Sequence, residues 1–496
     1  MIRLHRLGPH WFAPRRLAPQ WLAPQRLAPQ WFVSLVALLA GCTMLGPDFQ
    51  RPQVALPDRY AEASEAGGTL TSVPSNWWRL YEEPELDRLV DAGLVRNTDV
   101  RLASARIEEA AAVLREAQAT LLPLIEGNVD AGRARTSQRT GAASGSGGSS
   151  AGPAVRNNFR IAATSSFELD FWGRLRRLRE SAGADFLASR YGRDAVMQAL
   201  SAAIAQTYFT VRSLDAQLVV SNETLAVADD SVEIARARAQ AGLVSDLDVY
   251  QAQGNQAQVA AQIKDLRRLR AAAVHQLGVL TGKLDLQPER SDMRTLPSPP
   301  LPPAGLPAAL LERRPDVRQA EAVFAAANAQ IGVARAAQFP TLSLTASLGV
   351  QSAELGNLLT ASAGIWSFGL GAVGPIFDAG RYAARTQQAE ARARQAAILY
   401  EQTVENAFRE VSDALSNVRL AADAEQDLAA RVTQARNALR LATMRYEAGY
   451  SAYLEVLDAQ RTVNEAQLAA ARNRQIFLGF TVDLMSALGG GWTPYH

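Results

Sequence analysis

The sequence predicts a mixed fold in which the strands of a membrane β-barrel are joined to long α-helical hairpins, and in which one structural unit occurs twice in tandem. Three observations predict it. Matching motifs recur at a nearly constant offset, long proline-free segments are rich in helix-forming residues, and four short segments alternate apolar and polar side chains. We expect each unit to supply two barrel strands and one long helical hairpin, giving four barrel strands per protomer.

Length and composition exclude several classes of protein. The chain has 496 residues, of which 48% are hydrophobic and 20% charged, so it folds. Removing the five arginines of residues 1–41 from the net charge of +2 leaves −3 for the remainder. A nucleic-acid partner calls for a basic face, so we expect none. A single cysteine excludes an internal disulfide and a thiolate zinc cluster, and we expect neither metal nor cofactor.

The first element is a signal peptide with a proline-rich leader, residues 1–41. Residues 32–41 form an apolar run too short to span about 30 Å of hydrocarbon as a helix, and the arginines before it supply a basic n-region. The run ends in Leu-Ala-Gly-Cys, which resembles a bacterial lipobox. We therefore expect Cys42 to carry a covalent lipid such as palmitate; the alternative is a short buried segment with an incidental thiol. Thr43, rather than aspartate, favours the outer membrane.

The internal repeat comes next. Asp99-Val100-Arg101 recurs 217 residues later, and several glycines recur 207 residues later. The offset drops by ten where the first copy carries a Gly/Ser-rich segment, residues 141–152, which reads as a flexible insertion. The glycine pairs are Gly173 and Gly380, Gly242 and Gly449, and Gly282 and Gly489.

The repeat and the proline content predict the domain boundaries. Each copy is expected to hold a helix, two strands and a helical hairpin, and seven prolines between the copies predict a stiff extended linker. The expected segments are a lipidated N-terminal segment and wrap (42–95), a first repeat (96–285, with strands in 123–171 and a hairpin in 173–282), the linker (286–307), a second repeat (308–489, with strands in 340–376 and a hairpin in 380–489) and a tail (490–496).

Four segments alternate with period two. The alternation is strong in 159–171 and 341–350 and weaker in 124–134 and 365–376. Membrane strands need about 9–11 residues, although a half-buried soluble sheet gives the same alternation. Open strand edges are not tolerated in lipid, and the smallest single-chain barrels have about eight strands, so a barrel of these strands must be shared between protomers.

The long helices follow the strands in each copy. Residues 154–287 and 376–493 contain no proline and are dominated by good helix formers. Gly242 and Gly449 are expected at the turns of the two hairpins, where glycine caps a helix in the left-handed conformation. A soluble coiled-coil rod gives the same helices, so only the strands favour the membrane interpretation.

The chain resembles the outer membrane factors of Gram-negative tripartite systems, the TolC-like channels, and especially the NodT/OprM-like lipoproteins of resistance-nodulation-division (RND) efflux. The resemblance covers residues 42–492 and implies a homotrimer with a 12-stranded barrel, four strands per protomer, above a periplasmic barrel of twelve helices with an equatorial belt. The resembling segments are GPDFQRP (46–52), FELDFWGRLRR (167–177), LLERRPDVRQAE (310–321), NAQIGVARAAQFPTLSLTASLG (328–349), PIFDAGR (375–381), RYEAGYSAYLEVLDAQR (445–461) and GGGW (489–492).

The resemblance implies a passive outer-membrane channel of an RND-type efflux system, lipid-anchored and extending into the periplasm. Its partners would be a periplasmic membrane-fusion adaptor, outer-membrane lipid and, indirectly, an inner-membrane pump. Two alternatives stay open, namely the exit duct of a type I secretion system and a structural lipoprotein that spans the periplasm. The sequence does not name the substrate.

Two features resemble catalytic or ligand motifs. Residues 369–374 satisfy G-x-G-x-x-G, but a dinucleotide site also needs a returning strand, so we expect these glycines to thin a barrel strand. His275 is the only histidine outside the leader and the C-terminal residue, and we expect it to be packed rather than to bind a ligand. Common hydrolase, P-loop and zinc-protease motifs are missing, so we expect no enzyme.

The two hairpin tips are the expected docking sites for the adaptor. Their sequences, around 242–248 and 449–455, are homologous but not identical, so a trimer would present six tips in alternating pairs. The other possibility is that the glycines serve only as helix caps. The residues assigned to docking are Gly242, Ser245, Asp246, Gly449 and Ser451.

The resemblance places a periplasmic gate just beyond the second tip. Leu454, Asp458 and Arg461 are spaced i, i+4, i+7 and so share one helix face. Threefold symmetry would make Leu454 an apolar ring and Asp458 a carboxylate ring. Arg461 and Tyr446 would hold the carboxylate ring through hydrogen bonds to neighbouring helices. The alternative is a solvated helix face carrying an i, i+3 ion pair worth a few tenths of a kcal/mol, on the order of 0.3.

Overall fold

The computed structural model describes residues 44–61, 73–135, 155–289, 298–301 and 310–492, and these belong to one compact unit that begins at Met44. Cys42, the leader, the 141–152 insertion and most of the linker lie outside the described residues. Within the described part, none of the helices combines the length and hydropathy needed to cross a membrane.

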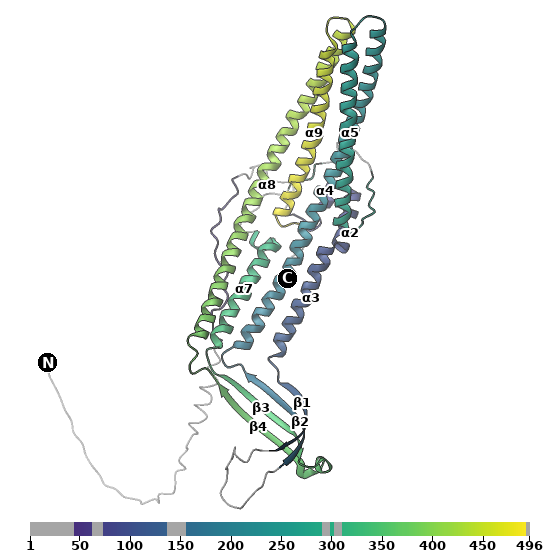
Figure 1. The fold of residues 1–496 in the computed structure, drawn as a ribbon. Coiled ribbons are helices and arrows are strands. Elements are labelled where there is room, and N and C mark those ends of the chain that lie inside the picture. The colour runs from purple at the N-terminus through teal and green to yellow at the C-terminus, as the bar shows by residue number, and fades with distance from the viewer. Residues whose placement is uncertain (1–43, 62–72, 136–154, 290–297, 302–309, 493–496) are drawn as a thin grey trace, which may run out of the picture. The chain divides into compact units, whose positions relative to one another are not determined.

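The same order of elements occurs twice along the chain (Figure 1). A helix is followed by two strands and two long helices, and the matching helices have equal or nearly equal lengths: 22 residues for the first pair, 67 for the second, and 36 and 35 for the third. The first set, after the 3-10 helix η1 (Trp77–Tyr81) and α2 (Pro84–Arg96), is α3 (Thr98–Ala119), β1 (Leu124–Arg135), β2 (Val155–Leu169), α4 (Arg174–Gln240) and α5 (Asp246–Thr281). The second set, after α6 (Leu310–Arg313), is α7 (Pro315–Ala336), β3 (Thr341–Ser352), the 3-10 turns η4 (Leu355–Asn357) and η5 (Ala361–Ala363), β4 (Gly364–Val373), α8 (Arg381–Glu447) and α9 (Tyr453–Ala487).

The four strands form one antiparallel sheet in the order β1-β2-β3-β4. All four predicted strands are therefore present, with shifted ends. β2 begins at Val155, before the predicted start, and β4 ends at Val373 rather than at residue 376. Pro375 explains the second shift because proline has no N–H to donate to a neighbouring strand.

Glycines set both ends of the long helices. Gly173 and Gly380 precede α4 and α8 with φ of 78° and 82°, and Gly242 and Gly449 follow these helices with φ of 71° and 79°. The positive φ confirms the predicted left-handed caps, because this region favours glycine over residues that carry a Cβ.

The helices pack side by side in two overlapping rows (Figure 1). Near the sheet, α3 packs on α4, α4 on α7, and α7 on α8. Towards the hairpin tips, α5 packs on α4, α4 on α9, and α9 on α8. Both rows therefore end in α8 on one side. On the other side, the row near the sheet ends in α3 and the row near the tips ends in α5.

The largest apolar core lies where the two rows overlap. Trp77 and Tyr81 of η1 are buried against Tyr208 and Phe209 of α4, and the Tyr81 hydroxyl shares a 2.7 Å hydrogen bond with Thr481 of α9. This core fixes η1 and α2 against the long helices.

The segment after Met44 is clamped onto both repeats. The Leu45 amide donates to the Trp172 carbonyl at 3.1 Å, and the buried Arg177 guanidinium donates to the carbonyls of Leu45 and Gly46. Further along, Arg51 forms 2.7 Å ion pairs with Glu312 and Glu321.

Candidate functional site

The sheet has one apolar and one polar face, which its register makes plain. Opposite Leu348 of β3 stand Ala163 of β2 and Trp366 of β4, and the same alternation continues along the strands. Trp366 and Phe368 are 79% and 70% exposed in the protomer. Apolar surface of this extent faces lipid in membrane barrels, since a soluble monomer rarely leaves it uncovered. The apolar face comprises mainly Ile125, Val129, Phe159, Ile161, Phe167, Leu169, Leu342, Leu344, Leu348, Val350, Trp366, Phe368 and Leu370.

The opposite face is polar and internally hydrogen-bonded. The Asn128 amide donates to Thr164 at 2.9 Å, and the Gln351 amide donates to Asn158 at 2.6 Å. The hydroxyls of Ser347 and Ser367 lie 2.8 Å apart. Such a face suits a water-filled lumen, because its donors and acceptors also bind water.

The glycine motif lies where the sequence predicts. Gly369 and Gly371 belong to β4, where they stand opposite Thr345 and Ser343 on the polar face. β4 leads into the 67-residue α8, not into the short helix and parallel strand of a dinucleotide site. These residues thin a strand, as predicted.

The α4–α5 tip is built from local interactions. Gly242 and Leu243 donate backbone N–H groups to the carbonyls of Ala239 and Arg238, both at 2.9 Å, which closes α4. Ser245 then caps α5, its hydroxyl accepting from the Leu247 N–H at 3.2 Å. Asp246 lies in the first turn of α5, where a negative charge is favourable.

The α8–α9 tip has the same backbone and different side chains. Gly449 and Tyr450 donate to the carbonyls of Tyr446 and Arg445 at 3.0 and 2.8 Å. Ala452 occupies the N-cap of α9 without a side-chain hydrogen bond, and the buried hydroxyl of Ser451 has no partner within the described residues. Tyr450 is 81% exposed at the end of the molecule.

The structure separates the predicted gate residues into two groups. Leu454, Asp458 and Arg461 are all exposed on α9, as their spacing predicts. Tyr446 is instead 8% exposed and points into the core beneath the tips, where its ring lies 4.6 Å from the Arg238 guanidinium carbon. Its hydroxyl has no partner within the described residues, so the predicted hydrogen bond from Tyr446 to a neighbouring helix is not made within the protomer and stays a prediction for contacts between copies.

The sequence reasoning missed the packing beneath the second tip. The rings of Tyr446 and Tyr453 lie 5.5 Å apart and form a small core with Val232, Val456 and Leu457. Two tyrosines seven residues apart across a predicted turn were the available signal. Arg238, from the first hairpin, had no such signal because only the fold brings it to Tyr446.

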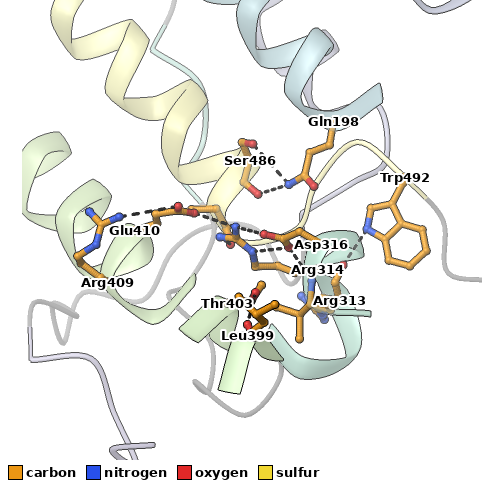
Figure 2. Close-up of polar contacts among 12 residues, drawn as sticks. Gln198, Arg313, Arg314, Asp316, Leu399, Thr403, Arg409, Glu410, Ser486 and Trp492 are labelled. Atoms are coloured by element: carbon orange, nitrogen blue, oxygen red, sulfur yellow. Dashed lines mark hydrogen bonds and ion pairs between the residues drawn. The ribbon is translucent and has the colours of Figure 1, made fainter. Parts of the chain in front are cut away.

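A polar cluster in the middle of the molecule also escaped the sequence reasoning (Figure 2). Arg314, 7% exposed, donates to the Ala487 carbonyl at 3.2 Å and forms ion pairs with Asp316 and Glu410 at 2.7 and 2.8 Å. Trp492 donates to the Arg313 carbonyl at 2.7 Å. The cluster ties the start of α7 to α8 and to the C-terminal end of α9, which is a structural task.

The prediction that His275 is packed is wrong. His275 is exposed on α5 rather than packed, because α5 is at the end of the row and turns this side away from α4. Within the described residues, no three His, Cys, Asp or Glu side chains are grouped so that they hold a metal ion.

Comparison with known proteins identifies the chain's relatives. A family model described as outer membrane efflux protein matches residues 89–283 and 306–490. The solvent efflux pump outer membrane protein SrpC of Pseudomonas putida is 34% identical over 470 residues, covering 92% of this chain and 97% of that protein. The cation efflux system protein CusC of Escherichia coli O6:H1 is 34% identical over 471 residues, covering 92% and 96%.

Solved structures agree with the sequence relatives. The outer-membrane channel OprN superposes with a TM-score of 0.85 at 28% identity, covering 91% of this chain and all of that chain. The open state of the Neisseria gonorrhoeae MtrE outer membrane channel gives a TM-score of 0.78 at 28% identity, covering 90% and 98%.

Proposed function

The chain belongs to the outer membrane efflux protein family, and on this premise we propose that it is the outer-membrane duct of a tripartite RND-type efflux system. It is an efflux channel of the outer membrane. The observation that carries the proposal is the four-stranded sheet, because one face is apolar and exposed while the other is polar, and the strands are long enough to cross a membrane. A periplasmic spacer needs no such sheet.

The edges of the protomer support a closed ring of copies. β1 and β4 are the edge strands of the sheet, and lipid does not tolerate unpaired edges. α3 leads into β1 and β4 leads into α8, so the sheet edges and the ends of the helix row lie on the same two sides. One head-to-tail interface can therefore cover both, and repeating it by rotation closes a ring. We assign three copies, a tandem duplication in each copy, a 12-stranded barrel and twelve periplasmic helices.

The tips and the N-terminus provide the proposed contacts with other components. The α4–α5 and α8–α9 tips would dock a periplasmic membrane-fusion adaptor, with Gly242, Ser245, Asp246, Gly449 and Ser451 at the contact. The inner-membrane pump would act through that adaptor. A lipid on Cys42 would add membrane affinity of about 0.8 kcal/mol per buried CH₂.

The substrate is set elsewhere in the system. The chain is equally similar, at 34% identity, to a protein named for solvent efflux and to one named for cation efflux. A duct that serves such different cargoes selects little itself, so we assign the choice to the pump. These names favour efflux over type I secretion, and a channel role requires no catalytic group in this chain.

Planar-bilayer recording of the purified protein tests the proposal. A duct gives discrete conductance steps of uniform size, and an Ile125→Asp/Phe368→Asp variant should not insert, because charges on the lipid face are costly. A matched variant with Ser347→Asp on the polar face should still insert. A wild-type protein that gives no steps would overturn the duct in favour of a periplasm-spanning spacer.

A further inference from the structure

We propose that each protomer carries, on the lumenal side of its helix row near the sheet, a groove that binds amphiphiles with an anionic head group as they pass through the duct. The inference rests on the proposed duct and adds a binding site to its wall. The groove lies where α4, α7 and α8 run side by side (Figure 1). Its volume of about 520 Å³ is typical of pockets that hold small organic molecules.

The groove combines an apolar floor with a basic rim. Ala326 of α7 and Ala389 of α8 line it and are buried, so its deepest part is apolar. Arg385 and Arg392 of α8 also line it, but they are exposed and form no ion pair within the described residues. Because the two arginines are seven residues apart, they share one face of α8 at a separation of about 10 Å along the axis. An apolar body can therefore rest on the floor while its head group meets a guanidinium.

The charge of the lining favours an anion. Among the described residues that line the groove, Asp185 of α4 carries the one carboxylate, and it pairs with neither arginine. Burial also raises the pKa of the Asp185 carboxyl above its ordinary value, which favours the neutral form. Two fixed positive charges thus face at most one negative charge. A cationic head group would meet repulsion here, and an anionic one would meet attraction.

The N-terminal strap, residues 44–51, shows on which side of the helix row the groove lies. The Asn328 amide of α7 donates to the Pro47 carbonyl of the strap at 3.0 Å. The rings of Phe324 and Phe49 lie 5.3 Å apart. Phe324 and Asn328 are one turn apart, so the strap covers one face of α7.

The groove lies on the opposite face. Ala326 is two residues before Asn328, which places it about 160° around the axis of α7. α8 is oriented in the same way. Arg335, seven residues after Asn328, pairs with Glu390 at 2.7 Å on the strap side. Arg392, two residues beyond Glu390, is turned to the other side with the groove.

The strap side is the outside of the proposed ring. The strap begins at Met44, two residues after the proposed lipid site at Cys42, and acyl chains must reach the bilayer that surrounds the barrel. The groove therefore opens into the lumen, where three copies present three grooves at one level. An anionic amphiphile is delayed there, while the choice of cargo stays with the pump.

Current blockade in planar bilayers tests the site. The probe is anilinonaphthalene sulfonate, which has an aromatic body and one sulfonate. Its uncharged analogue phenylnaphthylamine is the control ligand. We expect the sulfonate to interrupt the current through the wild-type duct briefly and repeatedly, and the analogue to do so at least about tenfold less often. Equal blockade by both ligands would overturn a site that depends on charge.

Matched variants locate the site on α8. Arg392→Gln removes one charge from the groove, and Arg394→Gln removes one from the opposite side of the same helix. The mean duration of a blockade should fall about threefold in Arg392→Gln and about tenfold when Arg385→Gln is added, because each loses a charged contact to the sulfonate. Arg394→Gln should leave the duration unchanged. Equal shortening by the Arg392 and Arg394 variants, or by neither, would show that the probe binds elsewhere.

Chemical protection separates the site from the duct. Gln388→Cys places a thiol in the groove, and the sulfonate should slow its reaction with a water-soluble maleimide at least about threefold. The thiol of Arg394→Cys should react at the same rate with and without the probe, and a chain with only the native Cys42 gives the background. Protection without current blockade would put the groove outside the lumen and overturn the inference while leaving the duct. A wild-type protein without conductance steps would overturn the proposed function and the lumenal site with it.

Discussion

At both hairpin tips a left-handed glycine ends a 67-residue helix through the same pair of backbone hydrogen bonds, yet the next helix begins differently. The α4–α5 tip has a serine cap and an acidic first turn, so local contacts hold it. The α8–α9 tip has alanine at the cap and rests on the rings of Tyr446 and Tyr453. The comparison teaches that identical backbone turns can be held by local capping or by packing between hairpins.

The difference assigns separate tasks to the two tips. Moving the α8–α9 tip disturbs a core shared with the first hairpin, including the Arg238–Tyr446 contact, so its position depends on its neighbours. The α4–α5 tip keeps its shape without them. We therefore expect both tips to dock a partner and only the second to act as a gate.

The largest effect is expected from the feature that both tips share. Gly242→Val or Gly449→Val places a β-branched residue at φ of 71° or 79°, at a cost of roughly 1–2 kcal/mol. A Cβ at either site meets no atom within 4 Å, so the trimer should remain in the membrane while efflux is lost. Antibiotic susceptibility and the trimer band in membrane fractions measure the two effects. Wild-type resistance in both variants would exclude docking at these turns.

The gate residues sharpen the comparison next. Asp458→Ala with Arg461→Ala removes the exposed charges beyond the second tip, and single-channel conductance should rise severalfold because the proposed rings at the gate lose their charged side chains. Asp246→Ala at the first tip is the matched control and should leave conductance unchanged. Unchanged conductance in the double variant, with trimers intact, would return Asp458 and Arg461 to a solvated helix face.

The caps should respond in opposite directions. Ser245→Ala removes the hydroxyl that accepts from Leu247 and should destabilise the start of α5 by about 1 kcal/mol. Ala452→Ser supplies the missing cap at the second tip and should stabilise the start of α9 by a smaller amount. Hydrogen exchange of the first-turn amides reports both changes. Faster exchange at both tips, or at neither, would show that capping does not distinguish them.

The smallest effect is a response of the second tip to alkali. Burial raises the pKa of the Tyr453 hydroxyl above its ordinary value of about 10. A raised folded-state pKa means that its contribution to stability is complete below about pH 10 and is lost as the pH rises through the folded-state pKa. Exchange at the α8–α9 tip should therefore accelerate with alkali more than at the α4–α5 tip. Tyr453→Phe should remove the difference; if it persists, another group causes it.

The sequence was a good guide wherever the pattern was local. Alternation predicted all four strands because side chains of period two must face lipid or water, and glycine spacing predicted both hairpin turns. The start of β2 was missed because Arg156, Asn157 and Asn158 lack apolar alternation, and only pairing with β1 makes them a strand.

Contacts between distant segments were out of reach. Tyr446 lies in the same motif as the exposed gate residues, yet only the fold shows that its ring lies under Arg238. His275 was expected to be packed because alanines surround it in sequence, yet α5 ends the helix row. In both cases the surroundings of the side chain depend on which helices the fold places beside it, and the neighbours in sequence do not reveal this.

The number of copies is the claim on which the duct and the six alternating tips both depend. Native mass spectrometry of the detergent-solubilised mature protein measures it most directly, and the same spectrum reports the N-terminus and any lipid on Cys42. We predict three chains, each starting at Cys42 and each heavier than its sequence by the mass of its acyl groups. A species of one or two chains under conditions that preserve the fold would contradict the account.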